Sequence, residues 1–472
     1  MAGRFLNLFK PIGRILPEIK VPERKVKFNE KIFWTALVLI VFLVMSEIPL
    51  YGIAATTGDS FAALRVIFAS NRGTLMELGI GPIVTAGLIL QLLSGSALIN
   101  CDMSKAEDRG LFTVASKVFS IILTGIQAGA YIISGMYQTT GIAAPIVIFF
   151  QLVAAGIVVM LLDELVQKGW GLGSGISLFI MAGVAQNILW STFSPSNGLF
   201  VGALTTLFNK TSGYTLFEWI IGSKSGVYPS LIGLIATIAA FLIIIYLNGF
   251  RIELPMSYAG YKGFRSKYPI KLLYVSNLPV IFASALFANV YFFSQLLWST
   301  NNHNNTNGWL NWIGTYTVPV NSTSATPTGG LVYYVTAPHN IQSVGADPVR
   351  ALIYLGILIA FCAVFSLIWL EVGGLGPEKV AQQLMDSGMQ IPGYRRSGRP
   401  IENILKRYIP VVTVLGGIIV ALVAGISDFL GVFGSGTGIL LSVGIIYQYY
   451  ELLMRERAAE MYPAFRRIIG EG

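Results

Sequence analysis

The chain has 472 residues, of which 54% are hydrophobic and 12% charged, with a formal net charge of +9. The charged share is about half of what soluble globular proteins carry, so the composition argues against a soluble fold and for a membrane protein. The two cysteines, Cys101 and Cys362, have neither metal-ligand nor disulfide-framework spacing and do not indicate a redox compartment.

Ten apolar stretches are long enough to cross a bilayer, which takes about 17–25 residues as a helix. Unpaired backbone amides are costly in lipid and the stretches lack the alternation of barrel strands, so we expect all ten to be helical. In chain order they cover roughly residues 32–50, 74–94, 112–135, 142–162, 172–190, 228–248, 271–296, 349–370, 408–428 and 437–454. The sequence therefore predicts an all-α membrane protein with ten transmembrane helices.

The positions of lysine and arginine predict the orientation. With the N-terminus in the cytoplasm, 27 of the 32 Lys and Arg residues fall in cytoplasmic segments and five in external ones. Such an excess is typical of the cytoplasmic side, so we expect both termini there, including the tail 455–472. The sequons at Asn209, Asn304 and Asn321 all lie in segments assigned outside, whether or not they are modified. The external run 299–330, rich in Asn, Thr, Ser and Gly, is expected to be a loosely ordered loop.

Residues 1–31 form a basic, amphipathic N-terminal segment. Apolar residues recur at helical spacing among Arg4, Lys10 and Arg14, and no signal-peptidase site follows. Two interpretations remain open: a helix lying on the cytoplasmic membrane surface, or a helix packed on the protein's own cytoplasmic face.

The two halves of the chain, 32–205 and 206–454, resemble each other. The fifth span opens with GLGSGISL (171–178) and the tenth with GSGTGILL (434–441). Five spans separate the two motifs, so equivalent helices would cross in opposite directions, as in an inverted repeat. The alternative is two independent small-residue packing faces. Pro82 and Pro279 also correspond, and each is expected to interrupt an apolar helix, as at a central site or a moving element.

The predicted spans lack the side chains that some classes of membrane protein require, and this excludes several functions. Both histidines, His303 and His339, fall outside the spans, which argues against an intramembrane hydrolase or a metal site. The acidic residues fall near span ends, whereas an ion-coupled secondary transporter of small solutes normally needs an ionisable group near the midplane. We therefore expect no cofactor and a passage that does not bind its cargo, with the transporter as the alternative.

Four motifs carry a resemblance to a known family: EIPLYGI (47–53), GIGPIVTAGLILQLL (79–93), KYPIKLLYVSNLP (267–279) and DSGMQIPGYRRSGRPIENILKRYIP (386–410). The chain resembles the protein-conducting channel family, the SecY-type α subunit of the translocon, in its archaeal and eukaryotic branch. The resemblance covers essentially the whole chain. It implies an hourglass of two five-helix halves and a lateral opening between the second and third spans on one side and the seventh and eighth on the other.

The resemblance also implies roles for individual residues. A constriction ring of aliphatic side chains would consist of Ile80, Val84, Leu172, Ile176, Ile281 and Leu441. Residues 54–70 match the plug, a short helix whose apolar face would be Phe61, Leu64 and Phe68. A polar cluster at the lateral opening would contain Thr85, Gln127 and Asn277.

The cytoplasmic loops 249–271 and 371–407 are rich in basic residues. The family docks ribosomes on these loops, which implies contacts from Lys262, Arg265, Arg395 and Arg396, although positive-inside topology alone explains part of this charge. The resemblance further implies two small single-span partner subunits, nascent polypeptide and signal sequences as cargo, and the lipid bilayer as the place of release. We expect location in a cell membrane, with the endoplasmic reticulum membrane as the alternative.

Overall fold

The computed structural model describes residues 9–14, 16–24, 26–53, 65, 68–95, 99, 106–133, 143–195, 198–208, 216–221, 229–258, 265–273, 278–318, 325–373, 375–387, 389–390 and 398–461. Ten long helices make up the body of this part of the chain. They are α2 (Phe28–Glu47), α4 (Gly81–Gly95), α5 (Ala106–Ile133), α6 (Ala144–Leu165), α7 (Gly175–Phe193), α10 (Leu231–Gly249), α11 (Leu278–Asn301), α15 (Pro348–Val372), α17 (Gly398–Phe429) and α18 (Gly436–Met461).

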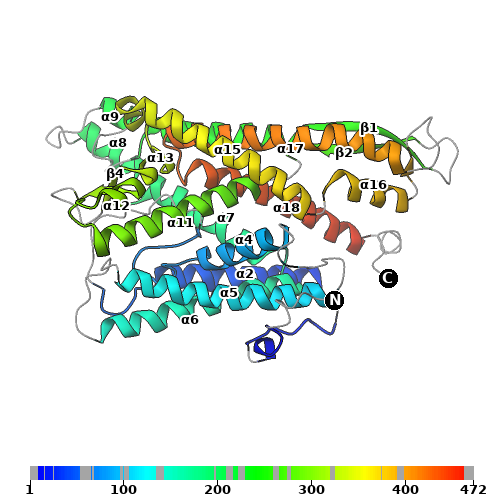
Figure 1. Ribbon diagram of the computed structural model, residues 1–472, viewed down its shortest axis with the longest axis horizontal. Coiled ribbons are helices and arrows are strands. Elements are labelled where there is room, and N and C mark those ends of the chain that lie inside the picture. Colours follow the sequence, from blue (N-terminus) through cyan, green and yellow to red (C-terminus); the bar gives the residue numbers. More distant parts are fainter. Residues whose placement is uncertain are drawn as a thin grey trace.

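Nine of these helices are long and apolar enough to cross a membrane, and α4 is a shorter apolar helix. The expected helical membrane fold is therefore confirmed. In Figure 1 the helices α2, α4, α5 and α6, blue to cyan, lie below α11, α15 and α17, while α7 and α18 contact each other near the middle. The outward faces are apolar, as on α10, where Ile235, Ile238 and Leu242 are exposed.

Both ends of the described chain lie at the same end of the molecule in Figure 1, here called the termini end; the opposite end is the far end. The described N-terminal residues contain only a 3₁₀ turn, η1 (Ile12–Arg14). Phe9 is buried against α5, with its ring centroid 5.7 Å from that of Phe119. This packing favours the second of the two interpretations of the N-terminal segment, contact with the protein's own surface.

An ionic cluster at the termini end holds the N-terminal segment against α5 and α6. Glu164 accepts from Lys117 at 2.6 Å and from Lys168 at 2.8 Å, and Lys168 also pairs with Glu18 at 2.5 Å. The hydrogen bond from Lys168 lowers the pKa of the Glu18 carboxyl below its ordinary value. Lys168 belongs to η2 (Val166–Trp170), a π-helical turn that ends α6.

Several expected helix boundaries are wrong because local breakers override hydropathy. α4 begins only at Gly81, since residues 71–80 form turns with left-handed glycines at 73 and 79. Pro82 and Pro279 do not interrupt helices: each is the second residue of its helix, where proline leaves no hydrogen bond unmade. α17 begins ten residues before the predicted span because the amphipathic stretch 398–407 continues the same helix.

The termini end also carries a small sheet that the expected loops did not include. β1 (Arg251–Tyr258) pairs antiparallel with β2 (Arg265–Lys271) and with β5 (Met389–Gln390), giving the order β2-β1-β5. The alternation in RIELPMSY is the strand signal that the search for long apolar stretches passed over. The helix α16 (Pro377–Asp386) packs Val380 and Leu384 into one core with Ile270 of β2.

The far end is built from short elements. These are α8 (Leu199–Phe208), α9 (Leu216–Ile221), α12 (Gly308–Ile313), β3 (Thr315–Thr317), β4 (Thr326–Gly329), α13 (Leu331–Val335) and α14 (Ile341–Ala346). The expectation of a loosely ordered 299–330 run is wrong for its described part. The Asn302 amide donates to Asn311 Oδ1 at 2.8 Å, and the Asn305 amide donates to the Tyr316 carbonyl at 3.0 Å. Side-chain hydrogen bonds of asparagines in this run therefore hold its short elements together.

Candidate functional site: an aliphatic constriction between the two halves

Residues from four helices or their entries meet where the two halves face each other. Ile80 and Leu441 are buried in one apolar cluster, and Val84, Ile176 and Ile281 pack against it half-buried. Leu172 is buried as well but lies outside that cluster. The structure thus brings together five of the six side chains assigned to the ring.

The ring residues of α7 and α18 owe their positions to buried carboxylates from the preceding helix. Asp163 Oδ1 accepts from the Ile176 N–H at 2.9 Å, and Asp428 Oδ1 accepts from the Gly436 N–H at 2.6 Å. Each aspartate therefore satisfies an N–H that a helix start leaves without a partner. A buried aspartate that accepts from the start of the next long helix occurs once in each half, which supports the inverted repeat.

The two helix starts align in a register different from the glycine match of the sequence motifs. Gly173 and Gly434 both have positive φ, 72° and 81°, and each precedes the first helical residue by two positions. Gly175 therefore corresponds to Gly436, two residues away from the sequence alignment. A Cβ on Gly175 would lie 2.6 Å from Asp163 Cα, so only glycine allows this close approach.

The segment that carries Leu172 is held from both sides. Its backbone N–H donates to Thr35 Oγ1 on α2 at 2.9 Å. Its carbonyl accepts from the Tyr449 hydroxyl on α18 at 2.9 Å, and that hydroxyl also lies 3.1 Å from the Ser174 carbonyl. Contacts from α2 and α18 thus fix the glycine-rich segment between η2 and α7.

A cavity of about 650 Å³ is lined by four of the ring residues, Val84, Ile176, Ile281 and Leu441. The ionic cluster of Lys117, Glu164 and Lys168 lines the same cavity. Polar groups in such a cavity can admit a hydrated chain, while a contact of aliphatic side chains can stop ions.

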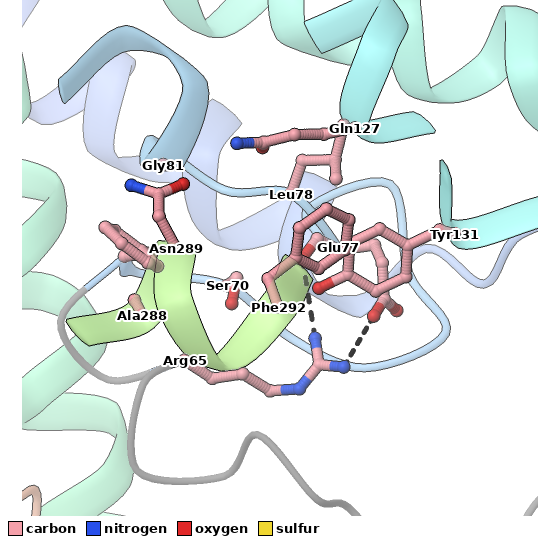
Figure 2. A pocket seen from close by; sticks show the side chains of 11 residues that line it. Arg65, Ser70, Glu77, Leu78, Gly81, Gln127, Tyr131, Ala288, Asn289 and Phe292 are labelled. Atoms are coloured by element: carbon pink, nitrogen blue, oxygen red, sulfur yellow. Dashed lines mark hydrogen bonds and ion pairs between the residues drawn. The ribbon is translucent and has the colours of Figure 1, made fainter. Parts of the chain in front are cut away.

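Phe68 and Ala69 are described residues of the expected plug that belong to, or pack against, the apolar cluster of the constriction. The Phe68 ring packs against this cluster, and the Phe68 carbonyl accepts from the Ile80 N–H at 2.8 Å. Phe61 and Leu64 lie outside the described residues. The buried pair Arg65–Glu77, 2.5 Å apart, ties this segment to the turn before α4 (Figure 2).

A polar contact joins the side chains of α4 and α11. Asn289 Nδ2 lies 3.4 Å from Thr85 Oγ1, and Figure 2 shows Gln127 of α5 and Asn289 of α11 on the wall of one small cavity. Asn277 lies outside the described residues, so Asn289 is the described α11 residue that meets Thr85. Tyr131 of α5 and Phe292 of α11 stack beside this cavity with ring centroids 5.1 Å apart.

The basic residues assigned to docking are less completely described. Lys262, Arg395 and Arg396 lie outside the described residues, and of Arg265 only the backbone, in β2, is described. The hairpin β1–β2 and the α16 region nevertheless lie together at the termini end, joined by the pairing of Ser257 with Gln390. Among the described residues no group of three His, Cys, Asp or Glu side chains could hold a metal ion.

The two helix bundles share a five-helix plan, and where they meet, uncharged aliphatic side chains pack together, with Phe68 against them. This arrangement is that of a helical membrane channel. Comparisons with known proteins identify which kind. A family model described as SecY matches residues 74–450, and another, described as the plug domain of Sec61p, matches residues 40–73. The chain belongs to the SecY/Sec61 α-subunit family of protein-conducting channels, and it resembles the eukaryotic Sec61 type.

Relatives and solved structures agree over nearly the full length. Protein transport protein Sec61 subunit alpha of Dictyostelium discoideum is 44% identical over 471 residues, covering 97% of this chain and 98% of the relative. The structure described as "The structure of a protein conducting channel" superposes with a TM-score of 0.81 at 36% identity, covering 96% of this chain and 98% of that one. Sec61 in the canine ribosome-channel complex from the endoplasmic reticulum gives 0.79 at 35% identity, again covering 96% and 98%. The chain is thus a protein-transport channel subunit in a membrane and not an enzyme.

We expect Asp428→Ala to release the start of α18 and loosen the constriction, whereas Asp428→Asn keeps an acceptor oxygen for the Gly436 N–H. Loss of a helix-capping acceptor costs about 0.5–2 kcal/mol. The thermal unfolding midpoint in detergent and the ion conductance in planar bilayers measure the effect. Unchanged values for Asp428→Ala in both measurements would contradict a holding role for this carboxylate.

Proposed function

We propose that the aliphatic constriction is the seal of the channel and opens around an unfolded secretory polypeptide on its way across the membrane. This proposal rests on the packing of Ile80, Val84, Ile176, Ile281 and Leu441 in one apolar cluster, four of which, all but Ile80, also line the 650 Å³ cavity. Such side chains offer no hydrogen bonds, so the ring excludes ions by dewetting and holds no particular sequence.

The plug segment supports the closed state from the far end. Phe68 covers the ring, and the ion pair Arg65–Glu77 anchors the segment that carries it. Both charged side chains are more than nine-tenths buried. Separating them without new partners is costly, so the plug leaves only when a translocating chain displaces Phe68.

The contact between α4–α5 and α11 supports a lateral gate. The Thr85–Asn289 contact joins the two sides by a hydrogen bond of a kind that contributes about 0.6 kcal/mol in a membrane protein. A leucine at mid-membrane gains about 0.3–0.6 kcal/mol, whereas Asp, Lys or Arg costs about 2.5–3.5 kcal/mol. A helix of roughly 20 leucines thus favours lipid by about 6–12 kcal/mol and leaves sideways, while a charged segment continues across.

The termini end faces the cytoplasm in this proposal, because 27 of the 32 Lys and Arg residues fall in segments that the sequence assigns to that side. Lys262, Arg265, Arg395 and Arg396, in the two basic loops of the sequence, would bind ribosomal RNA phosphates. Ribosome-bound relatives, such as the canine Sec61 and the yeast Ssh1 complex, support this assignment. Two small single-span subunits would complete the complex. The similarity to Sec61 proteins favours the endoplasmic reticulum over the cell membrane that the sequence suggested.

Polar substitution of the ring tests the seal. Ile80→Asn together with Ile281→Asn hydrates the constriction, so we expect preproteins with weakened signal sequences to be translocated at increased yield. The control is Ile235→Asn with Leu242→Asn, which makes similar changes on the exposed face of α10. Translocation assays in reconstituted vesicles measure the yield. Equal stringency in the ring variant and the wild-type channel would rule out the ring as the seal.

Removing the aromatic stack tests the gate. Phe292→Ala deletes the partner of Tyr131, and such stacks contribute about 0.5–1.5 kcal/mol beyond their buried area. Marginally hydrophobic test segments should therefore integrate roughly two- to tenfold more often relative to translocation. The neighbouring Phe293→Ala, whose ring is half exposed on α11, is the control. If both variants integrate the test segments alike, α5 and α11 do not form the gate.

Charge reversal tests docking. Arg395→Glu with Arg396→Glu should lower ribosome affinity in co-sedimentation at fixed salt, and the slope of log affinity against log salt should become shallower. Arg24→Glu with Lys27→Glu makes the same change of charge elsewhere on the termini end and should leave binding nearly unchanged. Equal losses in both pairs would mean that total charge, and not this loop, governs ribosome binding.

A further inference from the structure

Among the described residues, two tryptophans on α12 are the most exposed large apolar side chains. Trp309 and Trp312 are 92% and 83% exposed and are spaced i, i+3, so they share one face of the helix. Figure 1 shows α12 beside the far end of α11, close to the ends of the long helices. The side chains thus project from a short helix at the level where the spans end.

The helix that carries them is held firmly on its inner side. The Asn302 amide, just beyond the end of α11, donates to Asn311 Oδ1 of α12 at 2.8 Å. On the other side, the start of α13 lies so close that a Cβ on Gly330 would come within 2.7 Å of the Asn311 carbonyl. Exposure of the two indoles is therefore a fixed feature of an ordered platform.

The platform is continuous with the surface of a spanning helix. Arg350 Nε of α15 donates to the Tyr333 carbonyl of α13 at 3.0 Å, and the Tyr333 hydroxyl donates to Asp347 at 2.7 Å. Leu331 on α13 and Leu352 on α15 are both exposed. Exposed apolar side chains thus occur on α12, α13 and the far end of α15, which contact one another in turn.

The absence of charged residues near the two tryptophans indicates which environment this surface contacts. From residue 299 to 346 the chain contains no Asp, Glu, Lys or Arg. Tryptophan is the residue type that favours the boundary between headgroups and acyl chains, because its ring is apolar and its N–H can still donate. A docking site for a soluble protein normally has a rim that includes charged side chains, which this segment lacks.

We propose that Trp309 and Trp312 insert into the headgroup region of the leaflet at the far end and anchor α12 to lipid. Because Asn302 links α12 to the end of α11, the anchor also fixes that end of a helix at the proposed gate. The ligand is the interfacial layer of a phospholipid bilayer. This contact needs neither the ring nor translocation.

Depth measurements on the full chain in phosphatidylcholine vesicles test the anchor. Nitroxide labels are attached at Trp309→Cys and Trp312→Cys in a chain that also carries Cys101→Ser; Cys362 is buried and stays. Leu352→Cys on α15 is the lipid control, and Lys379→Cys on the exposed face of α16 is the water control. We expect oxygen to relax labels 309 and 312 more than a water-soluble nickel complex does, as for Leu352. Labels that behave like Lys379 would overturn the proposal.

Native tryptophans provide a second test, because cysteine substitution itself removes an indole. Vesicles of lipid brominated near the carbonyl end should quench a larger fraction of the emission of the wild-type chain than of Trp309→Phe with Trp312→Phe. Equal quenched fractions would also overturn the anchor. Neither measurement depends on protein transport, so failure of the proposed channel mechanism and failure of the anchor are separable.

Discussion

The architecture depends on two buried carboxylates, one in each half. Asp163 and Asp428 accept hydrogen bonds from the first N–H groups of α7 and α18, which begin inside the protein body. Without water, a free N–H at such a helix start is costly, so a glycine-rich turn can deliver a helix to this place only with an acceptor supplied nearby. The caps therefore allow Ile176 and Leu441 to meet residues of α4 and α11 at one constriction.

Charge is excluded from that constriction and paired elsewhere. Arg65 and Glu77 form a buried ion pair in and next to the plug segment. Glu164 forms ion pairs with Lys117 and Lys168, which line the cavity. The five aliphatic side chains of the proposed seal lie in one apolar cluster and are held there by packing. Contacts between aliphatic side chains have no directional bonds to break. The five side chains can therefore separate around a chain of any sequence and pack together again afterwards. A tight seal and indifference to sequence follow from the same choice of side chains.

Hydropathy and charge were enough to predict the helical membrane fold, and the ring followed from motif resemblance. The details that failed depend on short-range or tertiary effects. Hydropathy alone could not show that Pro82 and Pro279 start helices, and the β1 alternation was hidden within a loop of high charge. Asn289 was missed because nothing in an apolar helix marks which asparagine faces Thr85. The aspartate caps had a signal, an Asp shortly before each Gly-Ser-Gly motif, whose meaning required the three-dimensional contact.

Site-specific photocrosslinking can show whether a translocating chain passes between the aliphatic side chains of the constriction. A crosslinking amino acid at Leu441 should react with a secretory chain arrested during translocation, and the same group at Leu242, on the exposed face of α10, should not. The Leu441 product should appear only while the chain is in transit. Completed transport without contact at Leu441 would contradict a polypeptide path through the aliphatic constriction.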